Sequence, residues 1–366
     1  MSSRPKLVIP KRYKEKYGEK FPIWSFSRIN TLHNCEHEYY LSRIKKMKSL
    51  DNIYSLCGSY AHEILEKYYC NEIKYQDMVV KFESDFLDVE ISDYKFSNDK
   101  EKNNKMRDKY KECVVHFFKT HNKMADKVAI EKLIWIDIEG NVFIGYVDAI
   151  HKDEDGNFII TDFKTSSMYK GKKVQEHGKQ LLLYALGLIQ GGVDINKIKV
   201  RWNFLKYVNI SYLQKNGKMK TTSGDRNNWV KSIKTPLKRD IRDFYDMDEW
   251  EVDLKIEECI RNNSLASLDN SIIGKYKLED CYVYPEVNQE SIVDLVDGLI
   301  SDINLIKSKG DDEVNWERNE IQSQDEYYCN VLCGVKKHCK YYKDYLNKKN
   351  LSDVEEEDII ALLEEI

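Results

Sequence analysis

The chain has 366 residues, of which 42% are hydrophobic and 33% are charged, and its formal net charge is −4. This length allows about two domains, or one domain with large insertions, and the apolar content excludes a wholly disordered chain. The longest apolar run, residues 181–189, is much shorter than the roughly 20 residues of a membrane span, so we expect no membrane helix, and the lack of an apolar segment behind the basic N-terminal residues predicts a cytoplasmic protein.

The N-terminal third of the chain predicts a basic arm followed by helices. Residues 1–22 are polar and basic, with no clear periodicity. Residues 25–48 show the apolar spacing of an amphipathic helix, with Ser27 as a candidate N-cap. Similar helical spacing continues further along the chain, so we expect a helical part over residues 24–127.

A change of periodicity marks the next part. Three runs rich in β-formers and separated by turn residues predict an antiparallel meander: residues 128–138, 142–151 and 158–164. A helix over 174–190 and a strand over 197–211 follow. A meander, a helix and a further strand predict an α/β core with one crossover over residues 128–211.

The C-terminal part has three predicted segments. Residues 212–320 are expected to form a basic loop followed by helices, and residues 321–345 hold three closely spaced cysteines. Residues 346–366 are an acidic tail, expected to be a solvated helix over 353–366. On this interpretation residues 23–345 form one module between the N-terminal arm and the tail.

Two carboxylates and a lysine mark a candidate site in the predicted meander. Asp162 and Lys164 share one face of their strand because side chains alternate along a strand, and Asp148 lies on the neighbouring strand. Carboxylate oxygens suit Mg²⁺ or Mn²⁺, which can activate water and stabilise charge on a phosphate. The lysine can position the water or offset developing charge. The alternative is a surface salt bridge on a hairpin.

The segment 197–242 is strongly basic and suggests a polyanionic partner. It carries thirteen Lys or Arg residues, opposed only by Asp225 and Asp240. Basic side chains hold phosphates, and exposed aromatic rings can stack on unpaired bases. The candidate DNA contacts are Lys215, Lys218, Lys220, Arg226 and Trp229. The alternative is that the lysines are merely solvated and the aromatic rings belong to the core.

Four short motifs follow one another in a recognisable order. They are Gly58-x-x-x-His62, Gly145-x-x-Asp148, Asp162-x-Lys164 and Gln180-x-x-x-Tyr184. Together they resemble the motif series of the RecB-type branch of the PD-(D/E)XK nucleases, and the stretch beginning at Trp24 is similar to that branch's N-terminal helix. The resemblance implies a restriction-endonuclease-like α/β core, in which a mixed sheet is flanked by helices, with helical insertions and a C-terminal cysteine segment.

The same resemblance implies roles for individual residues. It implies that His62, Asp148 and Asp162 bind the metal together with the carbonyl oxygen of Phe163, and that Lys164 is the catalytic lysine. Gln180 and Tyr184 would steady the site or the DNA backbone. Glu131, which lies on the first predicted strand, receives no role.

Three of the nine cysteines, Cys329, Cys333 and Cys339, crowd together near the C-terminus. Four thiolates suit either Zn²⁺ or an iron–sulfur cluster. The resemblance to AddB-like and CRISPR-adaptation nucleases implies Cys35 as the fourth ligand and a [4Fe–4S] cluster. The spacing Cys329-x-x-x-Cys333 departs from the CxxC pair of those relatives. Zinc is the alternative, which His338 would favour as a ligand.

These features together predict a Mg²⁺- or Mn²⁺-dependent DNA nuclease. We expect an exonuclease that acts on single strands or ends, in recombination, repair, replication or phage DNA metabolism, within the host cytoplasm if phage-encoded. No G-x-x-x-x-G-K-[ST] motif occurs, so a helicase or recombination protein would be a separate partner. The rival interpretations are a non-catalytic DNA-binding subunit and a zinc-stapled interaction protein whose acidic tail docks a partner.

Overall fold

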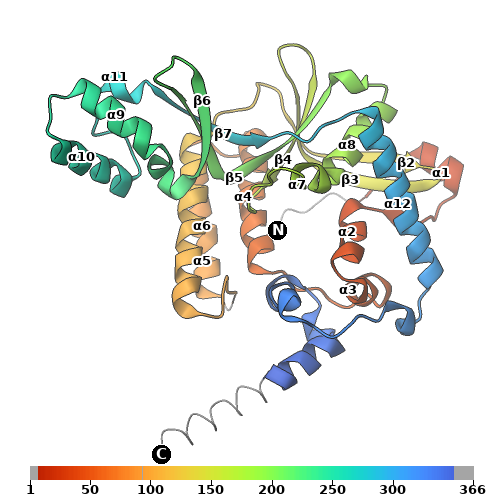
Figure 1. Cartoon of the computed structure of the whole chain (residues 1–366). Helices are drawn as coiled ribbons and strands as arrows, with labels where there is room; N and C mark the ends of the chain where they lie inside the picture. Colours follow the sequence, from red (N-terminus) through yellow and green to blue (C-terminus); the bar gives the residue numbers. More distant parts are fainter. Residues whose placement is uncertain (1–6, 93, 350–366) are drawn as a thin grey trace, which may run out of the picture. The chain divides into compact units, whose positions relative to one another are not determined.

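The computed structural model describes residues 7–92 and 94–349, and the chain divides into two compact units (Figure 1). In the described part, the first unit comprises residues 57–92, 94–134 and 146–292, and the second comprises residues 7–56, 135–145 and 293–349. No helix in these ranges combines the length and the apolar character that crossing a membrane requires.

Helices and strands of the first unit follow the predicted succession over most of its length. Its helices are α4 (Ile53–Tyr69, which begins in the second unit), α5 (Asp77–Ile91), α6 (Lys100–Thr120), α7 (Lys173–His177), α8 (Lys179–Gln190), α9 (Lys234–Phe244), α10 (Glu249–Asn262) and α11 (Asn270–Ile273). Its strands are β4 (Phe158–Lys164), β5 (Ile198–Leu213), β6 (Met219–Asp225) and β7 (Tyr276–Val283). Two further strands, β2 (Ala129–Ile138) and β3 (Asn141–Lys152), run from one unit into the other.

The strands form a seven-stranded mixed sheet in the order β1-β3-β4-β5-β6, with β2 paired to β3 and β7 paired to β5. β3 and β4 are antiparallel, as the meander predicted, and β4 and β5 are parallel, with Asp162 opposite Trp202. The α8 helix provides the crossover between β4 and β5. The expected mixed sheet flanked by helices is therefore confirmed.

One core of the first unit packs α8 against β4 and β5. Leu181 and Ala185 of α8 lie in a cluster with Ile160, Val200 and Trp202, all of them fully or almost fully buried. β4 is buried along nearly its whole length, and its sequence is accordingly a mostly apolar run, because both faces of such a strand exclude water. β5 instead alternates buried and more exposed residues over much of its length. These two patterns explain why the sequence already marked β4 and β5 as strands.

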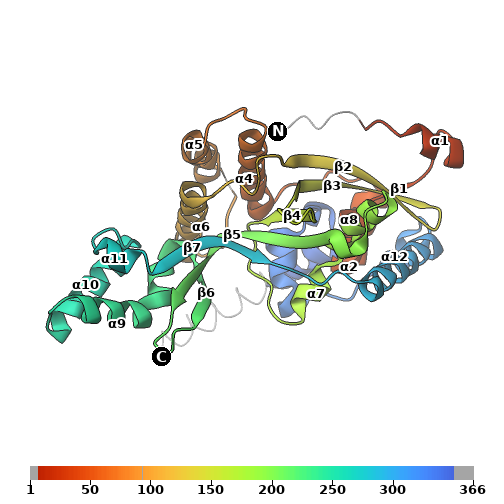
Figure 2. The ribbon, with the colours of Figure 1, turned by 90° about the horizontal axis from the view of Figure 1, so that it is seen from above.

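A second core lies further along β5. Val208 and Ile210 of β5 pack with Leu237 and Ile241 of α9 and with Ile256 of α10. These helices gather beyond β6 in both views of the ribbon (Figures 1 and 2). The long strand β5 thus passes from one core to the other.

Two predictions about the C-terminal half were wrong. The basic loop expected at the start of residues 212–320 contains β6, which pairs antiparallel with β5 from Tyr207↔Asp225 to Leu213↔Met219. A 3₁₀ helix, Arg226–Ile233, follows it. The remainder of 212–320, predicted to be helical, contains β7. Its period of two is hidden in the sequence because the charged residue Asp280 occupies a position in the interior of the strand.

The second unit begins with a short helix inside the predicted arm. Its elements include α1 (Lys11–Tyr17), β1 (Ile23–Trp24), α2 (Phe26–Asn34), α3 (Glu36–Tyr39), a π-helix (Tyr40–Ile44) and most of α12 (Gln289–Lys309). α1 is anchored because Lys16 Nζ lies 2.6 Å from Asp137 Oδ2 and the Tyr17 hydroxyl donates to the same oxygen. The predicted helix of the acidic tail, 353–366, lies outside the described residues.

The predicted helix over 25–48 is divided into three parts. Its N-cap is Ser25 rather than Ser27, because the Ser25 hydroxyl accepts a hydrogen bond from the backbone N–H of Arg28 at 3.3 Å. α2 ends at Asn34, and Cys35 takes up an extended conformation before α3 begins. The backbone therefore turns at the cysteine that was expected to be a ligand.

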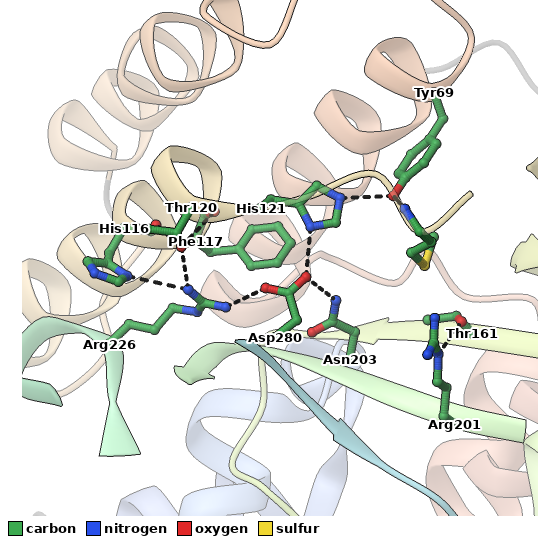
Figure 3. Close-up of polar contacts among 11 residues, drawn as sticks. Tyr69, His116, Phe117, Thr120, His121, Thr161, Arg201, Asn203, Arg226 and Asp280 are labelled. Carbon is green, nitrogen blue, oxygen red and sulfur yellow. Dashed lines mark hydrogen bonds and ion pairs between the residues drawn. The ribbon is translucent and has the colours of Figure 1, made fainter. Parts of the chain in front are cut away.

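A buried polar network connects the helices and strands of the first unit (Figure 3). Asp280 of β7 is at its centre: Oδ1 accepts from Arg226 Nη2 at 2.6 Å, and Oδ2 lies 2.8 Å from His121 Nδ1 and accepts from Asn203 Nδ2 at 3.2 Å. His121 Nε2 lies 2.9 Å from the Tyr69 hydroxyl. The Asp280 carboxylate thereby joins α4, the end of α6, β5 and β7 to the 3₁₀ helix after β6.

The charge state of this network follows from its contacts. Burial alone would raise the pKa of Asp280, but its hydrogen bond with His121 and the charge of Arg226 outweigh burial and lower that pKa. Arg226 is 1% exposed, and its Nη1 also donates to Thr120 Oγ1 at 2.7 Å. A buried guanidinium of this kind needs its carboxylate partner, because an unpaired charge in the interior is strongly unfavourable.

Replacing Asp280 with Ala should lower the free energy of unfolding by about 3–5 kcal/mol, because Arg226 would stay buried without its counter-ion. Urea denaturation followed by circular dichroism measures the change. The control is Asp253→Ala. The Asp253 carboxylate is half-exposed and lies 2.5 Å from Lys238 Nζ, so its removal should change the free energy of unfolding by less than about 1 kcal/mol. Equal, small effects of both changes would contradict this account of the network.

Candidate metal and active site

His62 lies on α4, one turn after Gly58. A Cβ atom at Gly58 would stand 3.3 Å from Thr165 Oγ1, just beyond the end of β4. A larger residue at this position would therefore press the helix away from the strand. The spacing Gly58-x-x-x-His62 accordingly brings the imidazole next to β4, where its ring meets that of Phe163 edge-on at 6.1 Å between centroids.

Two carboxylates from neighbouring strands approach this imidazole. Asp148 Oδ2 of β3 lies 3.5 Å from His62 Nδ1, and it accepts a hydrogen bond from the backbone N–H of Phe163 at 2.7 Å. Glu131 of β2 completes a group in which the ligand atoms of all three side chains lie within 4.8 Å of one another. One helix and two strands thus bring three metal-ligating side chains together.

Asp162 and Lys164 lie on β4 beside this group. Lys164 Nζ is 2.8 Å from Asp162 Oδ2, as expected for two side chains on one face of a strand. Burial acts to lower the pKa of Lys164, but the charges of Asp162 and Asp148 outweigh it and raise that pKa. The lysine is therefore an ammonium ion at neutral pH.

The electrostatics of the group favour ligand binding by the imidazole. Burial lowers the pKa of His62; the negative charges of Asp162 and Glu131 act in the opposite direction, whereas the charge of Lys164 adds to the lowering. A neutral imidazole has a free lone pair, which metal coordination requires. One imidazole nitrogen and two carboxylate groups at this spacing therefore fit a divalent cation, and the carboxylate oxygens suit Mg²⁺ or Mn²⁺.

Gln180 and Tyr184 form a pair one turn apart on α8. Gln180 Nε2 donates to the Tyr184 hydroxyl at 2.8 Å, and Tyr184 is 4% exposed. Burial raises the pKa of Tyr184, and the charge of Asp162 raises it further, so the phenol stays neutral. The pair therefore offers neutral polar groups next to the charged side chains of β4.

The composition of this group differs from the sequence-based expectation in one respect. Glu131, which received no role, lies with His62 and Asp148, whereas Asp162 is engaged with Lys164. Nothing in the sequence around Glu131 predicts its backbone conformation. Its φ of +47° is uncommon for a residue with a side chain. Asp162 and the carbonyl oxygen of Phe163 stay predicted ligands.

The four cysteines of the predicted cluster line one small pocket of the second unit. Cys35 precedes α3, and Cys329, Cys333 and Cys339 come from the C-terminal segment. Arg318 Nη1 lies 3.7 Å from Cys35 Sγ and 3.5 Å from Cys329 Sγ, so a cation accompanies the thiols. Cysteines separated by about 290 residues in the sequence are therefore neighbours, as the predicted set requires.

The structure corrects two of the candidate DNA contacts. Arg226 and Trp229 are 1% and 5% exposed, so neither side chain can face a strand of DNA. Arg226 is buried because it pairs with Asp280, and Trp229 belongs to the core of α9 and α10. Lys215, Lys218 and Lys220 are exposed on the β5–β6 hairpin, as expected.

Comparison with known proteins supports one family. The family model described as the PD-(D/E)XK nuclease superfamily matches residues 23–261. No curated protein matches the chain. The chain is also similar to a solved structure, described as "Crystal structure of SSO0001", at 17% identity over 57% of this chain and 85% of that one, with a TM-score of 0.19. A TM-score this low carries no argument about either fold or function.

Replacing Glu131 with Gln or Asp148 with Asn should weaken Mn²⁺ binding at least tenfold, because each change removes one anionic ligand; even outer-shell changes weaken metal binding about 10- to 100-fold. Isothermal titration calorimetry measures the affinity. The control is Glu63→Gln, next to His62 on α4, where the carboxylate pairs with Lys67. Unchanged Mn²⁺ affinity in Glu131→Gln would exclude Glu131 as a ligand.

Proposed function

The chain belongs to the PD-(D/E)XK nuclease superfamily, and from that premise we propose that it is a metal-dependent nuclease that hydrolyses phosphodiester bonds in DNA. One observation carries the proposal: His62, Glu131 and Asp148 converge beside the Asp162–Lys164 pair. This arrangement joins a set of metal ligands to a fixed ammonium group, and phosphodiester hydrolysis uses both.

The proposed role of each side chain follows from its contacts. His62, Glu131 and Asp148 would hold the metal, with Asp162 and the Phe163 carbonyl as further candidates. A bound Mg²⁺ or Mn²⁺ supplies an activated water and stabilises negative charge on the phosphate.

The remaining polar groups act without the metal. Lys164, held by Asp162, offsets the charge that develops on the phosphate oxygens. The hydrogen-bonded Gln180–Tyr184 pair places neutral polar groups near Asp162, whose charge acts on Tyr184.

We further propose an exonuclease of the RecB-type branch that acts on single strands or ends of DNA. The four motifs in order support this assignment. The setting would be recombination, repair, replication or phage DNA metabolism, with any helicase or recombination protein as a separate chain. Lys215, Lys218 and Lys220 are the proposed DNA contacts, and their exposure agrees with this role.

The four cysteines are proposed to hold a [4Fe–4S] cluster, with zinc as the alternative. Support comes from the shared pocket and from the guanidinium of Arg318, which lies next to two of the thiols. Thiolate ligands carry negative charge, so a cation at this position lowers the free energy of the loaded site. The proposed role is structural, because the ligands join α2 and α3 to the C-terminal segment of the second unit.

The nuclease proposal is tested with end-labelled DNA, linear and circular, single- and double-stranded, incubated with Mg²⁺ or Mn²⁺. Lys164→Ala should reduce cleavage by at least about 10²-fold, since it removes a charged group aimed at the transition state, while DNA binding is retained. Lys197→Ala removes an exposed lysine at the opposite end of the parallel β4–β5 pair and serves as the control. Cleavage by Lys164→Ala at the wild-type rate would contradict the assigned chemistry, and cleavage of circles would contradict the exonuclease assignment.

The cluster proposal is tested on anaerobically purified protein, which should be brown and contain iron and acid-labile sulfide. Cys35→Ser and Cys333→Ser should lose iron and thermal stability to a similar extent, because both residues would hold the same group. Cys70→Ser, an exposed cysteine on no such pocket, is the control. Colourless protein with stoichiometric zinc would support the alternative, and full iron content in Cys35→Ser would exclude Cys35 as a ligand.

A further inference from the structure

A basic groove of about 920 Å³ lies in the first unit between the β5–β6 hairpin and the segment formed by the 3₁₀ helix and α9. Seven of its lining residues are Lys or Arg, and the only acidic one is Asp243. Small-molecule sites are mostly apolar. The composition of this groove instead suits a ligand with several negative charges.

Three of the basic side chains are available to such a ligand. Lys215, Lys220 and Lys231 have no ion-pair partner among the described residues. The other basic residues of the groove are mostly engaged: Lys234 with Glu257 at 2.7 Å and Arg242 with Glu249 at 2.7 Å. The unpaired charges come from both walls of the groove, since Lys215 and Lys220 belong to the hairpin and Lys231 to the 3₁₀ helix.

The two walls are fixed to each other. A Cβ atom at Gly224 would stand 2.4 Å from Ser232 Oγ, so only glycine allows β6 to lie this close to the 3₁₀ helix. Arg226, at the junction between β6 and that helix, is held by Asp280 in the interior (Figure 3). The positions of Lys220 and Lys231 are therefore set by the packing of β6 against the 3₁₀ helix, while Lys215 lies in the turn between β5 and β6.

Among the described residues that line the groove, no aromatic ring is exposed. Its one aromatic lining residue, Tyr212, is 7% exposed and packs against Tyr276. Proteins that bind single strands stack bases on aromatic side chains, whereas lysines alone contact phosphates. A groove with charge but without a stacking surface fits the backbone of a duplex, whose bases are already stacked.

The distance to the site of cleavage follows from the sheet register. Asp162 pairs with Trp202 of β5, and Lys220 pairs with Tyr212 of the same strand. From residue 202 to residue 212, at about 3.3 Å per residue, the strand covers at most about 33 Å, since its pairing with β7 is irregular between Asn203 and Val208. Phosphates along one strand of a duplex are spaced about 3.4 Å apart along the helix axis, so this length corresponds to about ten base pairs.

We propose that this groove binds the phosphate backbone of duplex DNA about ten base pairs away from the bond that is cleaved. The inference rests on the proposed function, because Asp162 and Lys164 mark the reacting bond. It specifies the substrate class of the proposed nuclease: DNA ends that are followed by a double-stranded segment. A double-stranded segment shorter than the separation between the cleaved bond and the groove does not enter the groove.

The test uses two stem-loops with the same single-stranded end and stems of 6 and 20 base pairs, with binding measured by fluorescence anisotropy in EDTA. In wild-type protein the plot of log K against log[salt] should be steeper for the long stem by about 2.7, at about 0.9 for each of three phosphate contacts. The variant Lys215→Ala/Lys220→Ala/Lys231→Ala should lose this difference. The variant Lys95→Ala/Lys100→Ala/Lys102→Ala removes three exposed lysines outside the groove and should keep it.

The inference is overturned if wild-type protein gives equal slopes for the two stems, or if the groove variant keeps the difference. Cleavage of the same DNAs with Mg²⁺ or Mn²⁺ distinguishes failure of this inference from failure of the proposed function. If the DNAs are cleaved but the salt slopes of the two stems do not differ through the groove lysines, the nuclease assignment stands and the groove proposal is wrong. If the slopes differ through these lysines but no DNA is cleaved, the groove is a duplex-binding site and the nuclease assignment is wrong.

Discussion

The strand β5 is the constraint on which the first unit depends. Its first half pairs in parallel with β4 and sets the position of Asp162 and Lys164, its second half pairs with β6, and β7 pairs with both halves. The pairing with β7 is irregular between Asn203 and Val208, so the register is set separately in each half. Within each half a slip of one residue would turn every side chain to the opposite face. One piece of backbone therefore carries both the strand pairing of the candidate active site and one wall of the basic groove.

The buried network around Asp280 fixes the second half of this arrangement. Interior charges are unfavourable unless paired, so the contact between Asp280 and Arg226 leaves few alternative positions for the segment after β6. His121 and Asn203 occupy the other carboxylate oxygen and join the helical layer to the sheet. Buried hydrogen bonds of this kind favour one packing of the helices on the sheet over others.

Hydrogen bonds between segments far apart in the sequence also organise the second unit. Glu38 and Tyr328 are hydrogen-bonded, and the backbone N–H of Leu50 donates to the carbonyl of Gly334 at 2.9 Å. These contacts join α3 and its continuation to the C-terminal segment, the same segments that the four cysteines would join. A cluster bound there would stabilise an arrangement that hydrogen bonds already define.

The sequence by itself determined those features that depend on local periodicity. The alternation of a strand put Asp162 and Lys164 on one face, and the helical spacing put Gln180 next to Tyr184. Tertiary structure alone decided the rest. Glu131 joins His62 and Asp148 through the pairing of separate strands, and Arg226 turns from a surface cation into a buried one because Asp280, far away in the sequence, receives it. Local patterns report which side of an element a residue occupies, whereas burial of a charge depends on a partner that only the folded chain brings near.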